Sequence, residues 1–379
     1  MRFWRRRLVA LGLAALLVAA LVALAADGPQ GPQDGKGHGG GLPGATATAA
    51  AARDGLPADL DQAAARLMLV GFAGTDARAP FFARLRRSDW GGVVLERANY
   101  LGARQLTALT AGVRRVARQA GHGAPLIGAV QLGGEDSAFP DLGPNPEPAT
   151  RDAADAGAQA AAAGRRLAVA GVRLTFAPAA DLASGGGAWE GRGFSDQAAT
   201  VAGDVRAAVD AYRHAGIAAA VGHFPGEGGA SGDPGVGPAT VGLSLDELRA
   251  ADLKPFAAVA HTVPAVQMSG AMYAAWDGVT PATLLPEAVA LLRRQGFGGA
   301  VVSADLNAVT AVTGGSAAQA AVEALKAGCD LLYVPGDAAD QEAARAAVAT
   351  AIRRGDVSAA RVRDALLHAD VLRREFAGP

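Results

Sequence analysis

The sequence Gly222-His223-Phe224-Pro225-Gly226-Glu227-Gly228-Gly229 follows the apolar run 217–221 and precedes a glycine-rich tract that continues to Gly237. A run of Ala and β-branched residues that stops at His-Phe-Pro-Gly is typical of a buried strand that ends in a loop. Such a strand delivers a polar side chain into the loop, as barrel enzymes do with catalytic groups. The alternative is a core histidine whose hydrogen bonds its neighbours satisfy, and the rest of the chain has to decide between the two.

Short apolar runs alternate with amphipathic segments on both sides of this sequence. The apolar runs predict strands at 68–72, 92–95, 126–131, 174–178, 217–222, 265–269, 300–303 and 330–334. The amphipathic segments predict helices at 77–87, 103–120, 150–170, 196–215, 245–260, 286–295, 316–327 and 338–353, and a last helix at 357–376. Ser244 and Glu247 form a capping-box pattern at the start of the fifth helix.

The order of these elements predicts the fold. Strand-then-helix units that follow one another without a long linker indicate an α/β protein, a single closed (β/α)8 barrel of the TIM type at residues 56–379. An open, doubly wound sheet is the alternative. No Gly-x-Gly-x-x-Gly motif after an early strand, with an acidic residue about twenty positions later, supports it.

The first residues have the pattern of a targeting segment. Arginines cluster in the first seven positions and precede an uncharged run at 8–26. We interpret residues 1–26 as a signal peptide or membrane anchor, and both place the remainder on the extracytoplasmic side, secreted or held at the membrane. Residues 27–55 are rich in Gly, Pro and Ala without an apolar period, which predicts a flexible linker.

Composition excludes several classes of partner. Half of the 379 residues are apolar, enough to bury a substantial core, and the 35 basic and 36 acidic residues nearly cancel. Bulk charge therefore indicates no nucleic-acid partner. The one cysteine, Cys329, lies in an apolar context and is expected in the core. No His-x-x-x-His pair or cysteine cluster indicates a metal, and we predict no cofactor.

In a barrel, functional groups belong at the carboxyl ends of the strands. Those ends carry Gln131-Leu132-Gly133-Gly134-Glu135, Phe176-Ala177-Pro178 with Asp181, Arg192-Gly193-Phe194, the His-Phe-Pro-Gly stretch, Met268-Ser269-Gly270 and Ser303-Ala304-Asp305-Leu306. In order and spacing these pieces resemble the single-barrel bacterial β-N-acetylglucosaminidases of glycoside hydrolase family 3, over about residues 58–375. The resemblance implies removal of terminal N-acetylglucosamine from cell-wall fragments with retention of configuration. It also implies a carboxylate nucleophile after the seventh strand and a His held by an Asp in the loop after the fifth.

The catalytic positions depart from the family pattern. The nucleophile position is occupied by Ala304, and Asp305 stands one residue later, where a strand would turn its side chain to the opposite face. The acid/base position is Gly235, although the orienting Asp233 remains. Losing a catalytic carboxylate typically costs roughly 10³ to 10⁶ in rate. No catalytic residue is assigned; the candidate carboxylates are Asp305, Glu227 and Asp233.

The positions that contact sugar in the family are also altered. The family's Lys before His-Phe-Pro-Gly is Gly222, the second His of its Pro-Gly-His-Gly is Glu227, and the His after the sixth strand is Gly270. The residues predicted to bind substrate are His223, Arg192, Asp181 and Glu227.

Three functions are compatible with this pattern. The first is a catalytically impaired family member, a pseudoenzyme, whose barrel mouth binds a carbohydrate such as a peptidoglycan fragment, or a partner, without cleaving it. The second is an active glycosidase with relocated carboxylates among Glu135, Glu227, Asp233 and Asp305, since two carboxylates about 5 to 5.5 Å apart form a retaining pair and a larger separation an inverting one. The third is a structural domain that docks onto envelope proteins, which predicts an exposed apolar patch away from the mouth.

Overall fold

The computed structural model describes residues 56–144 and 152–378. The predicted targeting segment at 1–26 and the predicted linker at 27–55 lie outside the described residues. Within the described ranges, none of the helices has the length and apolar character needed to cross a membrane.

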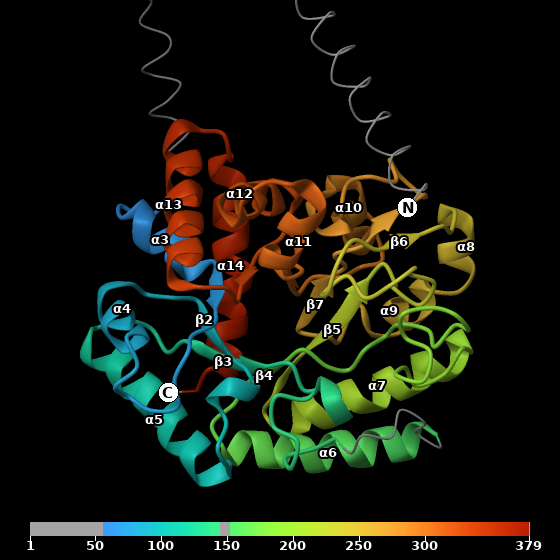
Figure 1. Ribbon diagram of the computed structural model, residues 1–379, viewed down its shortest axis with the longest axis horizontal. Helices are drawn as coiled ribbons and strands as arrows, with labels where there is room; N and C mark the ends of the chain where they lie inside the picture. The colour runs from blue at the N-terminus through green and yellow to red at the C-terminus, as the bar shows by residue number, and fades with distance from the viewer. Residues whose placement is uncertain (1–55, 145–151, 379) are drawn as a thin grey trace, which may run out of the picture. The chain divides into compact units, whose positions relative to one another are not determined.

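Eight parallel strands form a barrel in the sheet order β10-β1-β2-β3-β4-β5-β7-β9 (Figure 1). They are β1 (Met68–Val70), β2 (Gly92–Leu95), β3 (Leu126–Ala129), β4 (Leu174–Thr175), β5 (Ala218–Phe224), β7 (Ala265–Met268), β9 (Ala300–Val302) and β10 (Leu332–Val334). A parallel bridge between Val302 and Leu331 joins the two edges of the sheet and closes it. The predicted barrel is confirmed, and each predicted strand overlaps an observed one.

Helices surround the strands (Figure 1). They are α3 (Leu60–Arg66), α4 (Phe81–Arg87), α5 (Ala103–Gln119), α6 (Ala153–Val169), α7 (Ala198–His214), α8 (Leu245–Ala250), α9 (Leu253–Val259), α10 (Pro286–Arg294), α11 (Leu306–Thr313), α12 (Ala317–Ala327), α13 (Ala338–Arg354) and α14 (Ala359–Phe376). The sequence did not predict α3 or α11. The single helix predicted at 245–260 is wrong: it is two helices, because Pro255 lacks an N–H and fits only the first turn of α9.

The predicted capping box at the start of α8 is confirmed. The Ser244 hydroxyl accepts from the backbone N–H of Glu247, and the Glu247 carboxylate accepts from the backbone N–H of Ser244.

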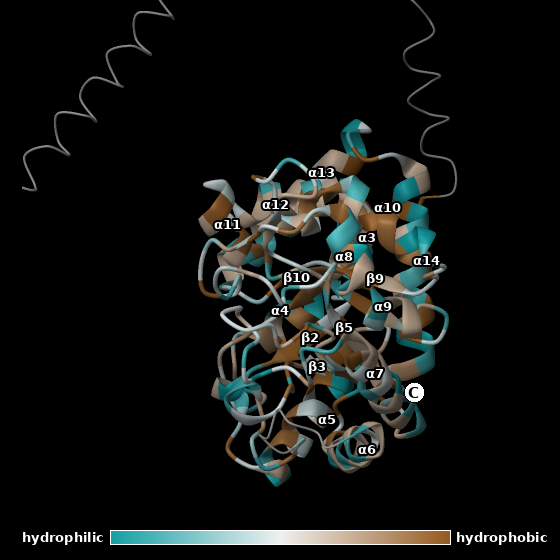
Figure 2. Cartoon of the chain, turned by 90° about the vertical axis from the view of Figure 1, so that its right-hand side faces the viewer, coloured by the Kyte–Doolittle hydropathy of each residue, from teal (hydrophilic) through white to brown (hydrophobic). Residues whose placement is uncertain are grey.

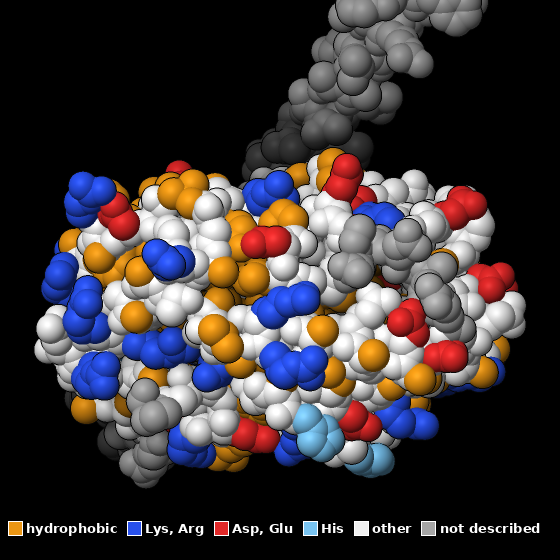
Figure 3. All heavy atoms as spheres, turned by 90° about the horizontal axis from the view of Figure 1, so that it is seen from below, with side chains coloured by type: hydrophobic (Ala, Val, Ile, Leu, Met, Phe, Trp, Pro, Cys, Tyr) orange, Lys and Arg blue, Asp and Glu red, His pale blue; other side chains and the backbone are white. Residues whose placement is uncertain are grey.

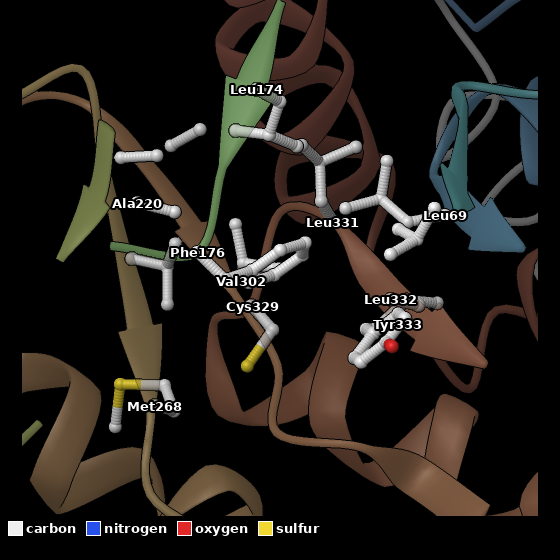
Figure 4. Close-up of a cluster of buried hydrophobic side chains, with 14 of the residues drawn as sticks. Leu69, Leu174, Phe176, Ala220, Met268, Val302, Cys329, Leu331, Leu332 and Tyr333 are labelled. Atoms are coloured by element: carbon white, nitrogen blue, oxygen red, sulfur yellow. The ribbon is translucent and has the colours of Figure 1, made fainter. Parts of the chain in front are cut away.

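The core lies inside the barrel and between the barrel and its helices. All residues of β1, β2, β3 and β7 are buried, as expected for parallel strands covered on both faces. Figure 2 shows hydrophobic residues on the central strands and hydrophilic ones on the outer helices. Figure 4 shows the side chains of Phe176, Met268, Val302 and Tyr333 in one buried cluster, and the rings of Phe176 and Tyr333 are 5.1 Å apart. Cys329 is fully buried in it, as predicted.

Loops at the carboxyl ends of the strands form the mouth of the barrel. Two further short strands, β6 (Thr240–Val241) and β8 (Met272–Tyr273), pair with each other there. Short 3-10 helices follow β2, β3 and β8: η1 (Arg97–Asn99), η2 (Gly134–Asp136) and η3 (Ala282–Leu284). The loops after β3, β4 and β5 carry most of the candidate site residues.

Candidate functional site

Strand β5 ends in the opening motif of the sequence and brings His223 to the mouth. The imidazole Nδ1 lies 2.9 Å from Oδ2 of Asp181, which comes from the loop after β4. The peptide bonds Gly222–His223 and Phe224–Pro225 are both cis. Asp181 has no exposed surface, and it also accepts from the backbone N–H groups of His223 at 3.1 Å and of Glu227 at 2.7 Å. Asp181 therefore lies behind His223 and fixes both the loop and the imidazole.

Glu227 is a second buried carboxylate beside the same imidazole nitrogen. Its Oε2 lies 3.6 Å from Nδ1 of His223, and its Oε1 accepts a hydrogen bond of 2.6 Å from the Ser269 hydroxyl. Burial opposes protonation of His223, but the carboxylates of Glu227 and Asp181 outweigh it and raise the pKa of His223 to about 9. Burial also raises the pKa of Glu227; the His223 charge opposes this effect, and the Asp181 charge adds to it. His223 is thus an imidazolium at neutral pH.

A stack of three side chains supports this group. The Trp189 ring lies 5.4 Å from the His223 ring, and the Arg192 guanidinium lies 4.6 Å from the Trp189 ring. Arg192 also donates to Asp136 from Nε and to Asp233 from Nη1, each at 3.0 Å. Sequence reasoning missed Trp189, which follows the Gly185-Gly186-Gly187 run after Ala188, because no local pattern fixes the path of a glycine-rich loop.

His223, Glu227, Arg192 and Asp233 line one cavity of about 170 Å³ at the mouth. The predicted residues of the carboxyl ends therefore meet at one place, and Asp181 contacts them from behind. The cavity is also lined by Trp189, Gln267, Gly235, Gly270, Ala304 and Asp305. Its size is on the scale of a single sugar ring.

The position of the family's nucleophile is small and apolar. Ala304 is 6% exposed, and a methyl group added at Gly270 would lie 3.6 Å from the Ala304 Cβ and 3.4 Å from the Pro234 Cβ. Ala304 and Gly235, the two positions that the resemblance assigns to catalysis, therefore line this cavity together with Gly270, and neither carries a carboxylate or an imidazole.

Asp305 has a structural partner set. It is the N-cap of α11, and its Oδ1 accepts from the backbone N–H groups of Asn307 at 2.8 Å and Ala308 at 3.1 Å. The expectation that Asp305 turns to the opposite face of a strand is wrong, because β9 ends at Val302 and the chain enters a helix. Asp305 still lines the cavity. Burial raises its pKa, and the two amides lower it.

The other candidate carboxylates are also engaged or displaced. Asp233 accepts from Gly235 N–H at 2.8 Å through one oxygen and from Arg192 through the other. Glu135 lines a second, larger cavity of about 470 Å³ and not the cavity beside His223.

Two groups of described residues bring three potential metal ligands within 4.8 Å of one another. They are Asp181, His223 and Glu227, and Asp330, Asp364 and His368. In the first group, Asp181 already accepts from two backbone amides and the imidazole. A cation would have to displace these bonds, so the donor set fits a protein-satisfied network better than a metal centre.

Comparison with known proteins identifies the family. The description "Glycosyl hydrolase family 3 N terminal domain" matches residues 60–372. The chain is 32% identical to the β-hexosaminidase of Stenotrophomonas maltophilia strain K279a over 282 residues, 71% of this chain and 83% of that protein. It is 34% identical to the β-hexosaminidase of Xanthomonas campestris pv. campestris strain B100 over 286 residues, 71% of this chain and 84% of that protein.

Solved structures agree. A glycoside hydrolase family 3 β-N-acetylglucosaminidase from Paenibacillus sp. strain FPU-7 superposes with a TM-score of 0.77 at 27% identity, covering 85% of this chain and 63% of that one. A β-N-acetylhexosaminidase from Beutenbergia cavernae gives 0.72 at 26% identity, covering 84% and 99%. The chain therefore belongs to glycosyl hydrolase family 3, as its strand-end motifs predict.

Proposed function

We propose that this protein binds the N-acetylglucosamine end of a cell-wall glycan at the barrel mouth, on the extracytoplasmic side, and does not hydrolyse it at the rate of an intact family member. One observation carries the proposal: Ala304 occupies the nucleophile position and lies at the cavity wall beside Gly270 and Pro234. A methyl group can neither attack the anomeric carbon nor stabilise the charge that develops on the sugar.

The adjacent carboxylate does not restore the chemistry. Asp305 accepts two backbone amides at the start of α11, and moving it toward a sugar would leave those amides without their cap. The acid/base position, Gly235, has no side chain, and its N–H is bound to Asp233. Both chemical steps of a retaining mechanism therefore lack their residue.

The binding half of the proposal rests on the polar groups that remain. The cavity presents a cationic imidazole from the end of β5, the Asp233 carboxylate from the loop after β5 and the Arg192 guanidinium from the loop after β4. The Gln267 amide lies beside Gly222, the position at which the family has a lysine. A Cβ added at Gly222 would lie 3.3 Å from Oε1 of Gln267. Convergent donors and acceptors at the end of a small cavity suit the hydroxyl and acetamido groups of one sugar.

The alternative of an active glycosidase has one observation in its favour. Glu227 is buried, has a raised pKa and lies beside His223, as an acid/base residue would. It stands as a single group, since Asp305 and Asp233 are bound elsewhere and Glu135 lines another cavity. The alternative predicts turnover that depends on Glu227.

The docking alternative predicts an exposed apolar face, and the described residues offer few large apolar side chains for one. The large apolar side chains most exposed among the described residues are Leu101, Val169, Val236, Val279, Leu367 and Val371. Leu367 and Val371 lie one turn apart on α14, whereas the other four belong to separate segments. On the face shown in Figure 3, hydrophobic side chains are interspersed with charged ones.

The test uses the full chain purified in mild detergent. We expect calorimetry to detect N-acetylglucosamine or short cell-wall oligosaccharides, and we expect no turnover of aryl β-N-acetylglucosaminides above the buffer rate. His223→Ala should abolish binding. Turnover that disappears in Glu227→Gln or Asp305→Asn would establish the active-glycosidase alternative in its place.

A further inference from the structure

The arginines of this chain are unevenly distributed over the barrel. A group of them lies in the last two turns of α4, α5 and α6 and just before β4, and we call this group the arginine face. Its members are Arg86, Arg87, Arg114, Arg115, Arg118, Arg165, Arg166 and Arg173. Arg114 and Arg173 are half-buried, and the others are exposed.

The ends of the three helices touch one another, so the arginine face is continuous. Nε2 of His122, in the loop after α5, lies 3.2 Å from the carbonyl oxygen of Arg86 at the end of α4. The Thr110 hydroxyl of α5 donates to the carbonyl oxygen of Ala170, directly after α6, at 2.7 Å. Figure 3 shows Lys and Arg side chains gathered on the left half of the molecule seen from below, the side on which Figure 1 places α4 and α5.

Two of the guanidinium groups are held close together. Arg114 donates to the carbonyl oxygen of Gly171, and Arg173 donates to that of Ala168 at 3.0 Å, so both lie at the end of α6. Burial lowers the pKa of Arg114, and the neighbouring Arg173 charge lowers it further. Like charges held at this separation repel each other, and a bound anion would relieve the repulsion.

No acidic side chain offsets these charges within the segments that carry them. The sequence has neither Asp nor Glu at 77–88, 97–134 or 156–180. Among the described residues, none forms an ion pair with a member of the arginine face. The acids closest along the neighbouring elements have other partners, since Asp89 pairs with Arg373 and Glu375 pairs with Arg213, each at 3.0 Å.

The helix dipole favours a basic residue in the last turn, but it does not explain the arginine face. In every other described helix with a basic last turn, at least one such residue pairs with an acid. The pairs are Arg66–Asp370, Arg84–Glu342, Arg213–Glu375, Arg249–Asp246, Arg293–Asp330, Lys326–Glu323, Arg353–Asp61 and Arg373–Asp89. Helices α5 and α6 instead leave their last-turn residues, Arg118 and Arg166, exposed to solvent.

An apolar side chain lies in the middle of the arginine face. Val169 is the last residue of α6, between Arg166 and Arg173 in the chain, and it is 79% exposed. Arginines around an exposed apolar side chain suit the surface of a bilayer, where headgroup phosphates lie next to acyl chains. A nucleic acid or another soluble polyanion would gain nothing from the valine.

We propose that the arginine face docks the barrel onto a membrane surface that contains anionic phospholipid. The sequence predicts a signal peptide or membrane anchor at 1–26, and a flexible linker of the length predicted at 27–55 spans about 30 Å on average, which brings a bilayer within reach. The ends of α4, α5 and α6 lead into the starts of β2, β3 and β4, at the end of the barrel opposite the mouth. A docked barrel therefore turns its mouth away from the bilayer.

The test places a fluorescent reporter on the arginine face of the full chain. Val169→Cys is labelled with an environment-sensitive dye, and Cys329 does not compete because it is fully buried. The protein is studied in phosphatidylcholine bicelles with and without about one third phosphatidylglycerol. We expect the emission to shift to the blue only with phosphatidylglycerol, and the shift to disappear as salt is added. Val279→Cys, 69% exposed after β8, is the control label and should not respond.

Two double variants test the charges at the salt concentration that halves the wild-type shift. Arg115→Gln with Arg118→Gln should lower the ratio of docked to free barrel by about tenfold or more, because each arginine near an anionic surface contributes about fivefold. Arg294→Gln with Arg354→Gln is the matched control. It removes two exposed arginines from the last turns of α10 and α13 and should keep the wild-type response. Thermal unfolding checks that each variant is folded.

The other outcomes would overturn the proposal. These are a label at position 169 that responds equally in both kinds of bicelle, a label that responds in neither, and an equal loss of docking in the two double variants. A shift produced by soluble polyphosphate and not by phosphatidylglycerol would assign the arginine face to a soluble polyanion instead. None of these results bears on glycan binding at the mouth, which is measured separately.

Discussion

Oδ2 of Asp181 lies 2.9 Å from Nδ1 of His223, and the two oxygens of the same carboxylate also accept the backbone N–H groups at both ends of the His-Phe-Pro-Gly-Glu loop. A single buried side chain thus holds the loop after β5 in place and sets the charge of its imidazole. The first prediction concerns this pair.

Asp181→Asn should lower the pKa of His223 from about 9 toward its ordinary value, because the variant removes one of the carboxylates that raise it and the hydrogen bond that accompanies it. It should also lower the free energy of unfolding by about 1 to 3 kcal/mol, since an amide cannot satisfy all three donors. Titration of the imidazole protons by NMR and urea unfolding measure the two effects. Asp233→Asn is the control, because Asp233 acts on His223 only at a distance, and its shift should be smaller. An unchanged pKa of His223 in Asp181→Asn would show that the Asp181 carboxylate does not raise it.

The raised pKa of His223 makes stability depend on pH in a defined window. The folded protein binds this proton more tightly than the unfolded chain, so the stabilisation is complete below pH 6.5 and is lost as the pH rises through about 9. The free-energy difference between the wild type and His223→Gln should therefore fall across that window, by up to about 3 kcal/mol. Denaturant unfolding at several pH values measures it. A difference that is constant with pH would contradict a buried imidazolium.

Asp252 should behave as a destabilising carboxylate at neutral pH. It is buried at the start of α9, where a Cβ on Gly226 would lie 2.7 Å from its Cβ, and burial together with Asp181 raises its pKa from 3.8 to about 6. The folded protein binds this proton more tightly than the unfolded chain, so the free energy of unfolding falls as the pH rises from 3.8 through about 6. Asp252→Asn should therefore be more stable than the wild type by about 1 to 2 kcal/mol near pH 7.5, with little difference near pH 4. A variant that is less stable at both pH values would show that the carboxylate has a partner role instead.

Restoring both missing groups should restore some turnover. Ala304→Asp with Gly235→His places a carboxylate and an imidazole at the two catalytic positions, and Asp233 already lies within two residues of the imidazole. We expect a gain of about tenfold or more over the wild type with an aryl β-N-acetylglucosaminide, limited by the missing sugar contacts. Ala304→Asn with Gly235→His is the isosteric control and should remain at the wild-type level. Equal activity in the two double variants would mean that position 304 does not face the anomeric carbon.

Asp305→Ala should change stability rather than chemistry. Loss of the α11 cap costs about 1 kcal/mol. Asp337→Ala is the matched control, since Asp337 caps α13 by accepting the amides of Ala339 and Asp340 in the same pattern. The two variants should lower the urea midpoint by similar amounts. A much larger loss of glycan affinity in Asp305→Ala than in Asp337→Ala would assign Asp305 to the ligand.

The barrel could be predicted from the sequence because its strands are short apolar runs bounded by Gly and Pro, and their alternation with helices allows few topologies. Helix α11 was not predicted, because its sequence, Leu-Asn-Ala-Val-Thr-Ala-Val-Thr, is short and rich in β-branched residues. Asp305, the residue that caps this helix, was interpreted as a possible catalytic residue. In sequence, an Asp just after a strand looks the same whether it caps a helix or takes part in catalysis.

The convergence of His223, Arg192 and Asp233 on one cavity agrees with their places at strand ends, although the sequence left open whether they meet. Two features could not be predicted in this way. Trp189 contacts His223 only because a glycine-rich loop folds back, and no local pattern fixes that path. The larger cavity, which Glu135 lines and which extends to α6 and α7, depends on how far these two helices stand from the loops, so its alanines are indistinguishable in sequence from close-packed core residues.

The ion pairs of Arg192 with Asp136 and Asp233 join the loops that follow three consecutive strands, β3, β4 and β5. The side chains of Arg192, Asp136 and Asp233 are 33%, 36% and 39% exposed. Attractions between charges with that much access to water weaken as ionic strength rises, over a Debye length of about 8 Å at physiological salt. Salt therefore loosens the ring of loops without altering the buried imidazole and carboxylates beneath it. The rates of ligand association and dissociation should therefore both rise as salt is added, while the dissociation constant stays nearly the same.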